Sequence, residues 1–141
     1  MAIDDVFRDV EQVLGQVPSW IREMPPEGLA GFWGLMKEFY LAETKIPNKY
    51  KELIGLAVSG ATRCKYCALF HTEAARVFGA TDAEIAEASL MGGMTMCAST
   101  WLNGQQTDYE TFAKETREII EYVRAHQPPR QRPTDGKTAH A

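Results

Sequence analysis

The amino-acid sequence predicts an all-α protein, a single domain of about six helices. Three observations support this fold class. Apolar residues recur at the i, i+3, i+4 spacing of an amphipathic helix over most of the chain. Proline, glycine and capping-box patterns divide this periodicity into segments of helical length. The strict alternation of apolar and polar residues that is typical of half-buried strands is scarce.

The N-terminal third of the chain predicts two helices. The first follows the apolar periodicity of residues 3–14 and stops near Gly15. The second begins near Glu27, after the double proline at 25–26, which breaks the preceding segment. Its apolar face consists of Leu29, Phe32, Trp33, Met36, Phe39 and Tyr40.

The middle of the chain contains an apolar run followed by a cysteine segment. Residues 50–61 are almost continuously apolar or small, which fits either a buried strand or a buried helix. Because the run is longer than a typical strand and rich in Ala and Leu, we interpret it as a helix. The next helix starts at Cys64 and runs to Phe78, before Gly79, a residue type favoured just after helix ends.

Two capping-box patterns, at 81–84 and 107–110, open the last two predicted helices. The first of these helices continues through the apolar segment 91–97, where two adjacent glycines predict a bend. From Pro128 onward no large apolar residue occurs. We therefore predict one helical domain over residues 1–127 and a disordered tail over 128–141.

Composition and charge exclude several classes of function. The chain of 141 residues has a formal net charge of −4, without the basic surplus that nucleic-acid binding requires. No apolar run approaches the roughly 18 residues of a membrane span. The acidic N-terminus lacks an apolar signal segment, so we expect a cytoplasmic protein with no nucleic-acid or membrane partner.

Three chemically reactive side chains gather at the start of the helix that begins at Cys64. Cys67 follows at i+3, and His71 lies four residues beyond Cys67. At about 100° per residue the three side chains fall within about 60° on one helix face. Thiols in a first helical turn lie beside unpaired N–H groups that stabilise a thiolate. The pattern favours a reversible disulfide and a histidine that exchanges a proton with Cys67.

Spacing alone leaves other interpretations open. The cysteine pair can be structural, or it can bind zinc together with His71, although the chain offers no paired Cys or His as further ligands. We expect no metal and no other cofactor. The third cysteine, Cys97, is interpreted as a small buried hydrophobe. Glu52 is either a surface charge beside Lys49 and Lys51 or a carboxylate that orients His71.

The spacing E-x11-C-x2-C-x3-H, which begins at Glu52, resembles the signature of the AhpD-like alkylhydroperoxidase family, within the carboxymuconolactone decarboxylase superfamily. The resemblance extends loosely over residues 25–125 and implies an AhpD-like helical bundle. It also implies a cysteine-dependent thiol peroxidase or disulfide reductase in which Glu52, Cys64, Cys67 and His71 form a proton relay. In that relay Cys67 attacks the peroxide, and Cys64 closes the disulfide.

The resemblance implies partners as well. The substrate is a hydroperoxide or a small disulfide, and the reductant is an unknown thiol, such as a lipoylated or thioredoxin-like protein. Single-repeat relatives form trimers or hexamers, which fits apolar residues such as Trp33 and Met94. One residue departs from the pattern: the best-studied members carry histidine before the second cysteine, whereas this chain has Tyr66.

Two other functions fit the same family. A decarboxylase-type enzyme acting on a lactone or related acid belongs to this superfamily, but it does not depend on a Cys-x-x-Cys pair. A non-catalytic oligomer can use the same disulfide as a redox sensor.

Overall fold

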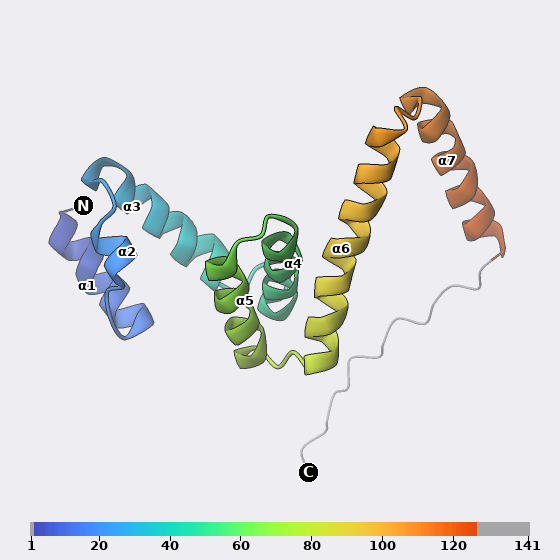
Figure 1. Cartoon of the computed structure of the whole chain (residues 1–141). Coiled ribbons are helices and arrows are strands. Elements are labelled where there is room, and N and C mark those ends of the chain that lie inside the picture. Colours follow the sequence, from blue (N-terminus) through green and yellow to red (C-terminus); the bar gives the residue numbers. More distant parts are fainter. Residues whose placement is uncertain (1, 127–141) are drawn as a thin grey trace, which may run out of the picture. The chain divides into compact units, whose positions relative to one another are not determined.

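The computed structural model of the chain describes residues 2–126, and in these residues it contains helices and no strand (Figure 1), which confirms the predicted all-α fold. The elements are α1 (Ile3–Leu14), α2 (Ser19–Arg22), α3 (Pro26–Leu35), the π-helix η1 (Met36–Leu41), α4 (Asn48–Ala61), α5 (Lys65–Val77), α6 (Asp82–Gly104) and α7 (Tyr109–His126). The chain divides into two compact units, and the first ends at Cys97, inside α6.

The core at the N-terminal end of the first unit is formed by α1, α2 and α3. Apolar side chains spaced three to four residues apart on α1 and α3 face each other because that spacing places them on one side of each helix. The short helix α2, which the sequence did not predict, adds one fully buried isoleucine. The buried cluster consists of Val6, Val10, Ile21, Leu29 and Trp33.

A polar contact at the rim of this core ties α1 to α3 and η1. The indole Nε1 of Trp33 donates to Asp9 Oδ2 at 2.7 Å, and Lys37 Nζ donates to Asp9 Oδ1 at 2.8 Å. The hydrogen bond from Lys37, followed by that from Trp33, lowers the pKa of the Asp9 carboxyl. A charged carboxylate is thereby matched by a cation at the edge of an apolar cluster.

The second predicted helix changes its hydrogen-bond pattern partway along. It begins as α3 and continues as the six-residue π-helix η1, which ends at Leu41. Side chains of α4 satisfy carbonyl oxygens at this end, where helical partners are missing. Asn48 Nδ2 donates to the Leu41 carbonyl at 2.9 Å, and Lys51 Nζ donates to that of Ala42 at 2.7 Å.

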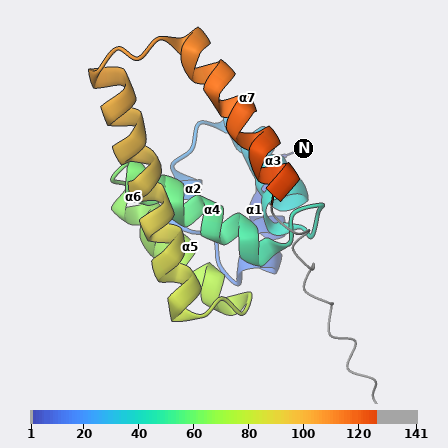
Figure 2. The same ribbon diagram turned by 90° about the vertical axis from the view of Figure 1, so that its right-hand side faces the viewer.

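The helices α4 and α5 pack side by side as a hairpin (Figures 1 and 2). The apolar run at 50–61 is helical, as predicted, and lies within α4. The buried positions of α4 recur every three to four residues, whereas a strand would bury every second residue. These buried residues are Asn48, Glu52, Leu56 and Ser59.

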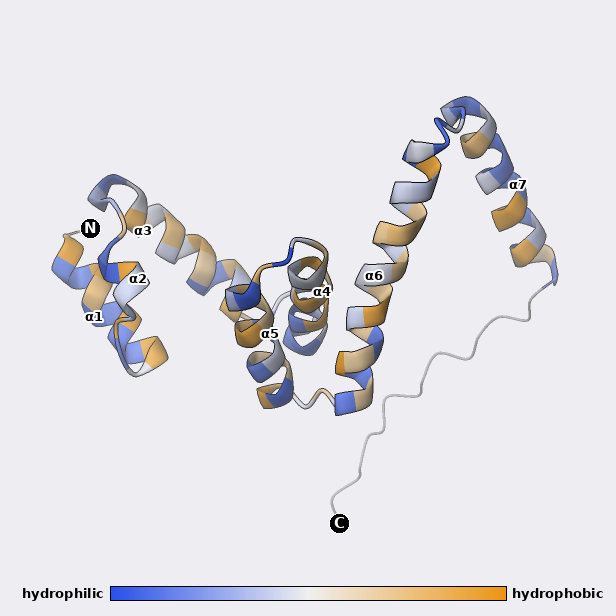
Figure 3. Cartoon of the chain, viewed as in Figure 1, coloured by the Kyte–Doolittle hydropathy of each residue, from blue (hydrophilic) through white to orange (hydrophobic). Residues whose placement is uncertain are grey.

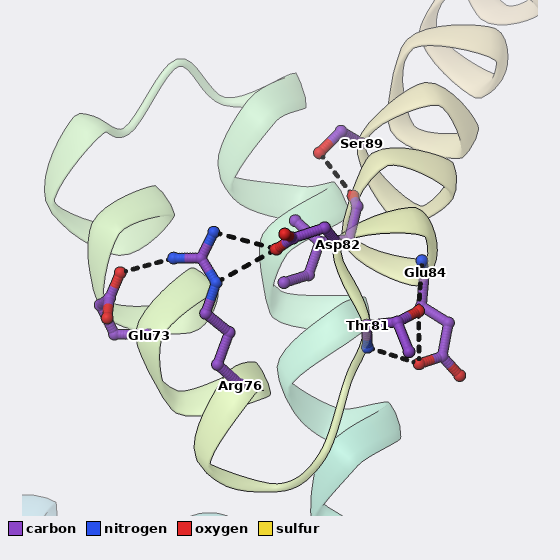
Figure 4. A network of polar contacts seen from close by, with 7 residues as sticks. Glu73, Arg76, Thr81, Asp82, Glu84 and Ser89 are labelled. Carbon is purple, nitrogen blue, oxygen red and sulfur yellow. Dashed lines mark hydrogen bonds and ion pairs between the residues drawn. The ribbon is translucent and has the colours of Figure 1, made fainter.

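The start of α6 is fixed by a reciprocal capping box, as the sequence predicted. The Thr81 backbone N–H donates to Glu84 Oε2 at 2.8 Å, and the Glu84 N–H donates to Thr81 Oγ1 at 3.2 Å (Figure 4). Lys49 on α4 donates to the other oxygen of the Glu84 carboxylate at 2.8 Å. Arg76 near the end of α5 pairs with Asp82 at 3.2 Å (Figure 4), so both helices of the hairpin hold the first turn of α6.

The two glycines at 92 and 93 do not interrupt α6, so the predicted bend is wrong. The helix runs without a break from Asp82 to Gly104. Gly92 has a different purpose, because a Cβ atom there would lie 2.6 Å from the backbone oxygen of Ala57 on α4. The glycine permits close contact between the two helices, whereas a Cβ on Gly93 would meet no atom within 4 Å.

The second unit, from Ala98, contains the end of α6 and all of α7. Asp108 caps α7, since the Thr111 N–H donates to its carboxylate at 2.8 Å; the cap is therefore one residue later than the predicted Thr107. Apolar residues lie all along α6 and α7 (Figure 3), and many are exposed. The predicted tail at 128–141 lies outside the described residues, and the domain boundary at residue 127 stays a prediction.

Among residues 2–126, no helix has both the length and the apolar character needed to cross a membrane.

The contact at Gly92 generates a prediction with a matched control. Gly92→Ala should lower the free energy of unfolding by about 1–3 kcal/mol, because the added methyl group overlaps a backbone oxygen that cannot move independently. Gly93→Ala should leave stability unchanged or raise it by up to about 1 kcal/mol through helix propensity. Urea unfolding of both variants at one protein concentration measures the difference; similar values for the two would contradict the close contact with α4.

Candidate active site

The cysteine pair lies at the start of α5, where the sequence predicted it. Cys64 is the N-cap residue, and its Sγ accepts a hydrogen bond from the Cys67 backbone N–H at 3.2 Å. The two cysteines form a disulfide, with their Cα atoms 5.4 Å apart. Cys64 is half-buried and Cys67 is exposed. On reduction, both sulfurs would lie beside the unpaired N–H groups and the positive dipole end of the helix, which favour a thiolate.

The turn between α4 and α5 fixes the position of Cys64. Arg63 occupies the left-handed region, with φ of 57°, which reverses the chain after α4. The Cys64 backbone N–H donates to the carbonyl of Ser59 at 3.0 Å, and the Arg63 N–H donates to that of Gly60 at 3.2 Å. These bonds satisfy carbonyls at the end of α4 and place the first cysteine at the beginning of α5 without a longer loop.

Glu52 is a buried carboxylate. It is only 1% exposed, although it lies between lysines in the sequence, so the surface-charge interpretation is wrong. Its Oε2 atom is 2.8 Å from His71 Nδ1 and accepts a hydrogen bond from the Tyr40 hydroxyl at 2.6 Å. The three side chains come from α4, α5 and η1, respectively. They satisfy one another's polar groups in a place where water has little access.

The Tyr40 hydroxyl contacts both members of this pair, since its oxygen is also 3.1 Å from His71 Nδ1. Burial, then the hydrogen bond to Glu52 and the negative charge of that carboxylate, raise the pKa of Tyr40 far above its usual range. The hydroxyl therefore keeps its hydrogen and acts as a neutral donor to Glu52.

Gly55 admits the His71 ring. A Cβ atom at position 55 would lie 2.3 Å from His71 Cε1 and 2.5 Å from Nδ1. Glu52 and Gly55 are three residues apart on α4, so the carboxylate and the space beside it are on the same helix face. The imidazole occupies this space, and its side chain is 17% exposed.

The structure brings the four predicted site residues together as two pairs. Cys64 and Cys67 form one pair, and Glu52 and His71 form the other. One member of each pair lies on α5. These two residues, Cys67 and His71, are four residues apart and therefore lie on one face of the helix. Within residues 2–126, the side-chain hydrogen bonds of His71 run to Glu52 and Tyr40 and not to a sulfur. Both of these hydrogen bonds use Nδ1, and among the described residues Nε2 makes none.

Sequence reasoning missed Tyr40 and Gly55 as parts of the site. Tyr40 is 12 residues from Glu52 and 31 from His71, and the sequence indicated only an apolar helix position. Gly55 is one glycine in an apolar helical run, where it signals close approach of another group but not which group. Cys97, predicted to be buried, is exposed, so that prediction is wrong for the isolated chain.

Fold and site together define a small all-α protein with a Cys-x-x-Cys disulfide at a helix start, next to a buried carboxylate–histidine pair. The model of the carboxymuconolactone decarboxylase family matches residues 26–101, more than half of the chain. The chain belongs to this family, as the sequence resemblance predicted.

A solved structure supports the same assignment. The crystal structure of the alkylhydroperoxidase AhpD core from Rhodospirillum rubrum ATCC 11170 is similar, with a TM-score of 0.68 and 31% sequence identity. The similarity covers 78% of this chain and 85% of that chain. The comparison with curated proteins gave no match.

The space beside Gly55 can be tested with a second glycine of the same helix. Gly55→Ala should lower the free energy of unfolding by about 1–3 kcal/mol, because the methyl group overlaps the imidazole and forces His71 away from Glu52. A Cβ on Gly60 would meet nothing within 4 Å, so Gly60→Ala should cost no stability. Thermal and urea unfolding monitored by circular dichroism measure both changes. Equal stability of the two variants would show that His71 does not occupy this space.

Proposed function

We propose that the protein is a cysteine-dependent thiol peroxidase or disulfide reductase. The observation that carries the proposal is the Cys64–Cys67 disulfide at the start of α5, one helical turn from a histidine held by a buried carboxylate. The helix start stabilises a thiolate, and the Glu52–His71 pair provides a base for its proton. The similarity to an alkylhydroperoxidase core adds independent support.

The proposed reaction balances in three steps. The Cys67 thiolate attacks a hydroperoxide ROOH; the S–O bond forms and the O–O bond breaks, which with one proton gives a sulfenic acid and ROH. The Cys64 thiol then displaces water from the sulfenic acid and closes the disulfide. An external dithiol reduces the disulfide to two thiols and is itself oxidised to a disulfide. With a small disulfide as substrate, Cys67 attacks a sulfur atom instead.

The exposure of the cysteine end suits contact with an external reductant. Cys67 and Tyr66 both lie at the surface, and Tyr66 is 76% exposed. The Tyr66 ring contacts the Lys65 ammonium at 5.1 Å and is not among the hydrogen-bond partners of Glu52 and His71. We therefore assign proton transfer to the buried pair rather than to position 66, and a lipoylated or thioredoxin-like protein is the proposed class of reductant.

We also propose a homotrimer or hexamer in the cytoplasm. Large apolar side chains of α6, including Met91 at 61%, Met94 at 60% and Trp101 at 65%, are exposed in the single chain. Such a concentration of exposed apolar groups is typical of surfaces that bury themselves against other subunits.

A decarboxylase-type activity on a lactone or related acid is the second candidate. The family model carries that description, and a buried carboxylate–histidine pair can serve acid–base chemistry without sulfur. This candidate predicts activity that survives the loss of both cysteines of the pair.

The proposed roles of the two cysteines, with Cys67 as nucleophile and Cys64 closing the disulfide, can be tested by changing each cysteine of the chain to serine. Cys67→Ser should reduce hydroperoxide consumption, measured with an excess of dithiol, to the rate of the dithiol alone, because the nucleophile is gone. Cys64→Ser should still form a sulfenic acid but turn over slowly, since no internal disulfide closes. Cys97→Ser is the matched control and should behave as wild type. Equal turnover of all variants would contradict the peroxidase, and thiol-independent cleavage of a lactone would favour the decarboxylase.

The activated thiolate has its own test in the reduced protein. Alkylation of Cys67 by iodoacetamide, followed by mass spectrometry across a pH series, should be half-maximal well below the value of about 8.5 that is typical of a free thiol. The cause is the first turn of α5 together with His71. Exposed Cys97, in the middle of α6, provides the internal reference. A midpoint for Cys67 at or above that of Cys97 would remove the basis for a reactive thiolate.

A further inference from the structure

Tyr40, Glu52 and His71 meet at three atoms that are all within hydrogen-bond distance of one another. The Tyr40 hydroxyl oxygen is 2.6 Å from Glu52 Oε2 and 3.1 Å from His71 Nδ1, and Oε2 is 2.8 Å from Nδ1. The Tyr40 ring is held in place from the side, with its centroid 6.1 Å from that of Phe70 and 5.9 Å from that of His71. The site described above gives the tyrosine a hydrogen bond to Glu52 but no part in the proton transfer.

The three contacting atoms are the Tyr40 hydroxyl oxygen, Glu52 Oε2 and His71 Nδ1. The hydrogens available to them determine which ring nitrogen of His71 is protonated. The hydroxyl has a single hydrogen, and it points at the nearer, charged acceptor, Glu52 Oε2. The hydroxyl oxygen then turns a lone pair toward Nδ1. His71 Nδ1 therefore faces two acceptors, Oε2 and the tyrosine oxygen, and must itself carry a hydrogen. In the neutral imidazole this leaves Nε2 without one.

We propose that Tyr40 is a positioning residue that selects the Nδ1–H tautomer of His71, so that Nε2 can accept the proton of the Cys67 thiol. This role rests on the proposed thiol chemistry. In the step that it serves, the S–H bond of Cys67 breaks and an N–H bond forms at Nε2. No electron is transferred, and Tyr40 and Glu52 keep their own protonation states.

The carboxylate alone does not secure this tautomer. If Oε2 took up a proton, it would donate to Nδ1, and the neutral ring would then carry its hydrogen on Nε2, where it is useless as a base. The tyrosine hydroxyl donates its hydrogen to this same Oε2 atom, which is thereby used as an acceptor, and so opposes that arrangement. The nearby ammonium of Lys51 is directed to the backbone oxygens of Phe39 and Ala42 and is not among the donors to Glu52.

The π-helix η1 places the tyrosine where it is needed. Residues in a π-turn are displaced relative to an α-helix by the wider hydrogen-bond spacing, and such turns are frequent at functional sites. Tyr40 is the fifth of the six residues of η1, and Asn48 and Lys51 fix the chain just after it. The hydroxyl thus reaches the α4–α5 hairpin from a different element.

Nitrogen NMR of the protein labelled with ¹⁵N-histidine tests the assignment directly in the oxidised form. The ring-nitrogen shifts distinguish the two tautomers, and the loss of signals in His71→Gln identifies His71. In wild type, Nδ1 should be the protonated nitrogen. Tyr40→Phe, which keeps the ring and removes only the hydroxyl, should increase the Nε2–H fraction. Tyr50→Phe makes the same change at a tyrosine that is 51% exposed and should have no effect.

The reactivity of the reduced protein should change in parallel. Alkylation of Cys67 at pH 7 should fall by about tenfold in Tyr40→Phe, which is part of the roughly 100-fold or larger contribution of a well-placed base. Unchanged nitrogen shifts and alkylation in Tyr40→Phe would overturn the proposal while leaving the peroxidase assignment intact. A wild-type ring protonated at Nε2 would overturn it even if the variant does not fold. Conversely, a tautomer shift in a protein that consumes no hydroperoxide would refute only the proposed function.

Discussion

A carboxylate that is 1% exposed is stable in a folded protein only when donors surround it, because a buried charge without partners costs several kcal/mol. In this structure the hydrogen-bond partners of Glu52, Tyr40 and His71, come from two different elements, η1 and α5. Each hydrogen bond to a charged group contributes about 1.5–3 kcal/mol. Removing one leaves a buried polar group unsatisfied and so destabilises the fold. The burial of this one charge therefore constrains how η1, α4 and α5 pack together.

The same constraint explains two features of the backbone that the apolar core does not require. Gly55 leaves space on α4 for the imidazole, and any larger residue there would overlap the ring. The change from α-helix to π-helix at Met36 alters the position of Tyr40 relative to the regular continuation of α3. Both features weaken a helix taken alone, since glycine and π-turns are unfavourable in helix interiors. The contacts that Gly55 and the π-helix make possible with Glu52 and His71 compensate for this loss of helix stability.

Sequence patterns were sufficient for features determined by neighbours along the chain. The helical period of α4, the capping box at Thr81 and the helix start at Cys64 each depend on residues within one or two turns, and each was predicted correctly. Tyr40 depends on partners 12 and 31 residues away, and no local pattern reports such a contact. The glycine at 92 shows the opposite failure: its local signal suggested a bend, whereas a backbone oxygen of another helix explains it.

The two pairs of the site have complementary surroundings, and α5 joins them. The sulfur end is exposed and lies at the helix start, where negative charge is favoured, while the histidine end is half-buried beside the Glu52 carboxylate. Moving a proton from Cys67 to His71 puts the new anion at the helix start and the new cation next to Glu52. Each product charge therefore forms where an opposite charge or dipole already exists, so little rearrangement is needed. This arrangement of charges supports the proposed formation of a thiolate at Cys67, without a cation from outside the chain.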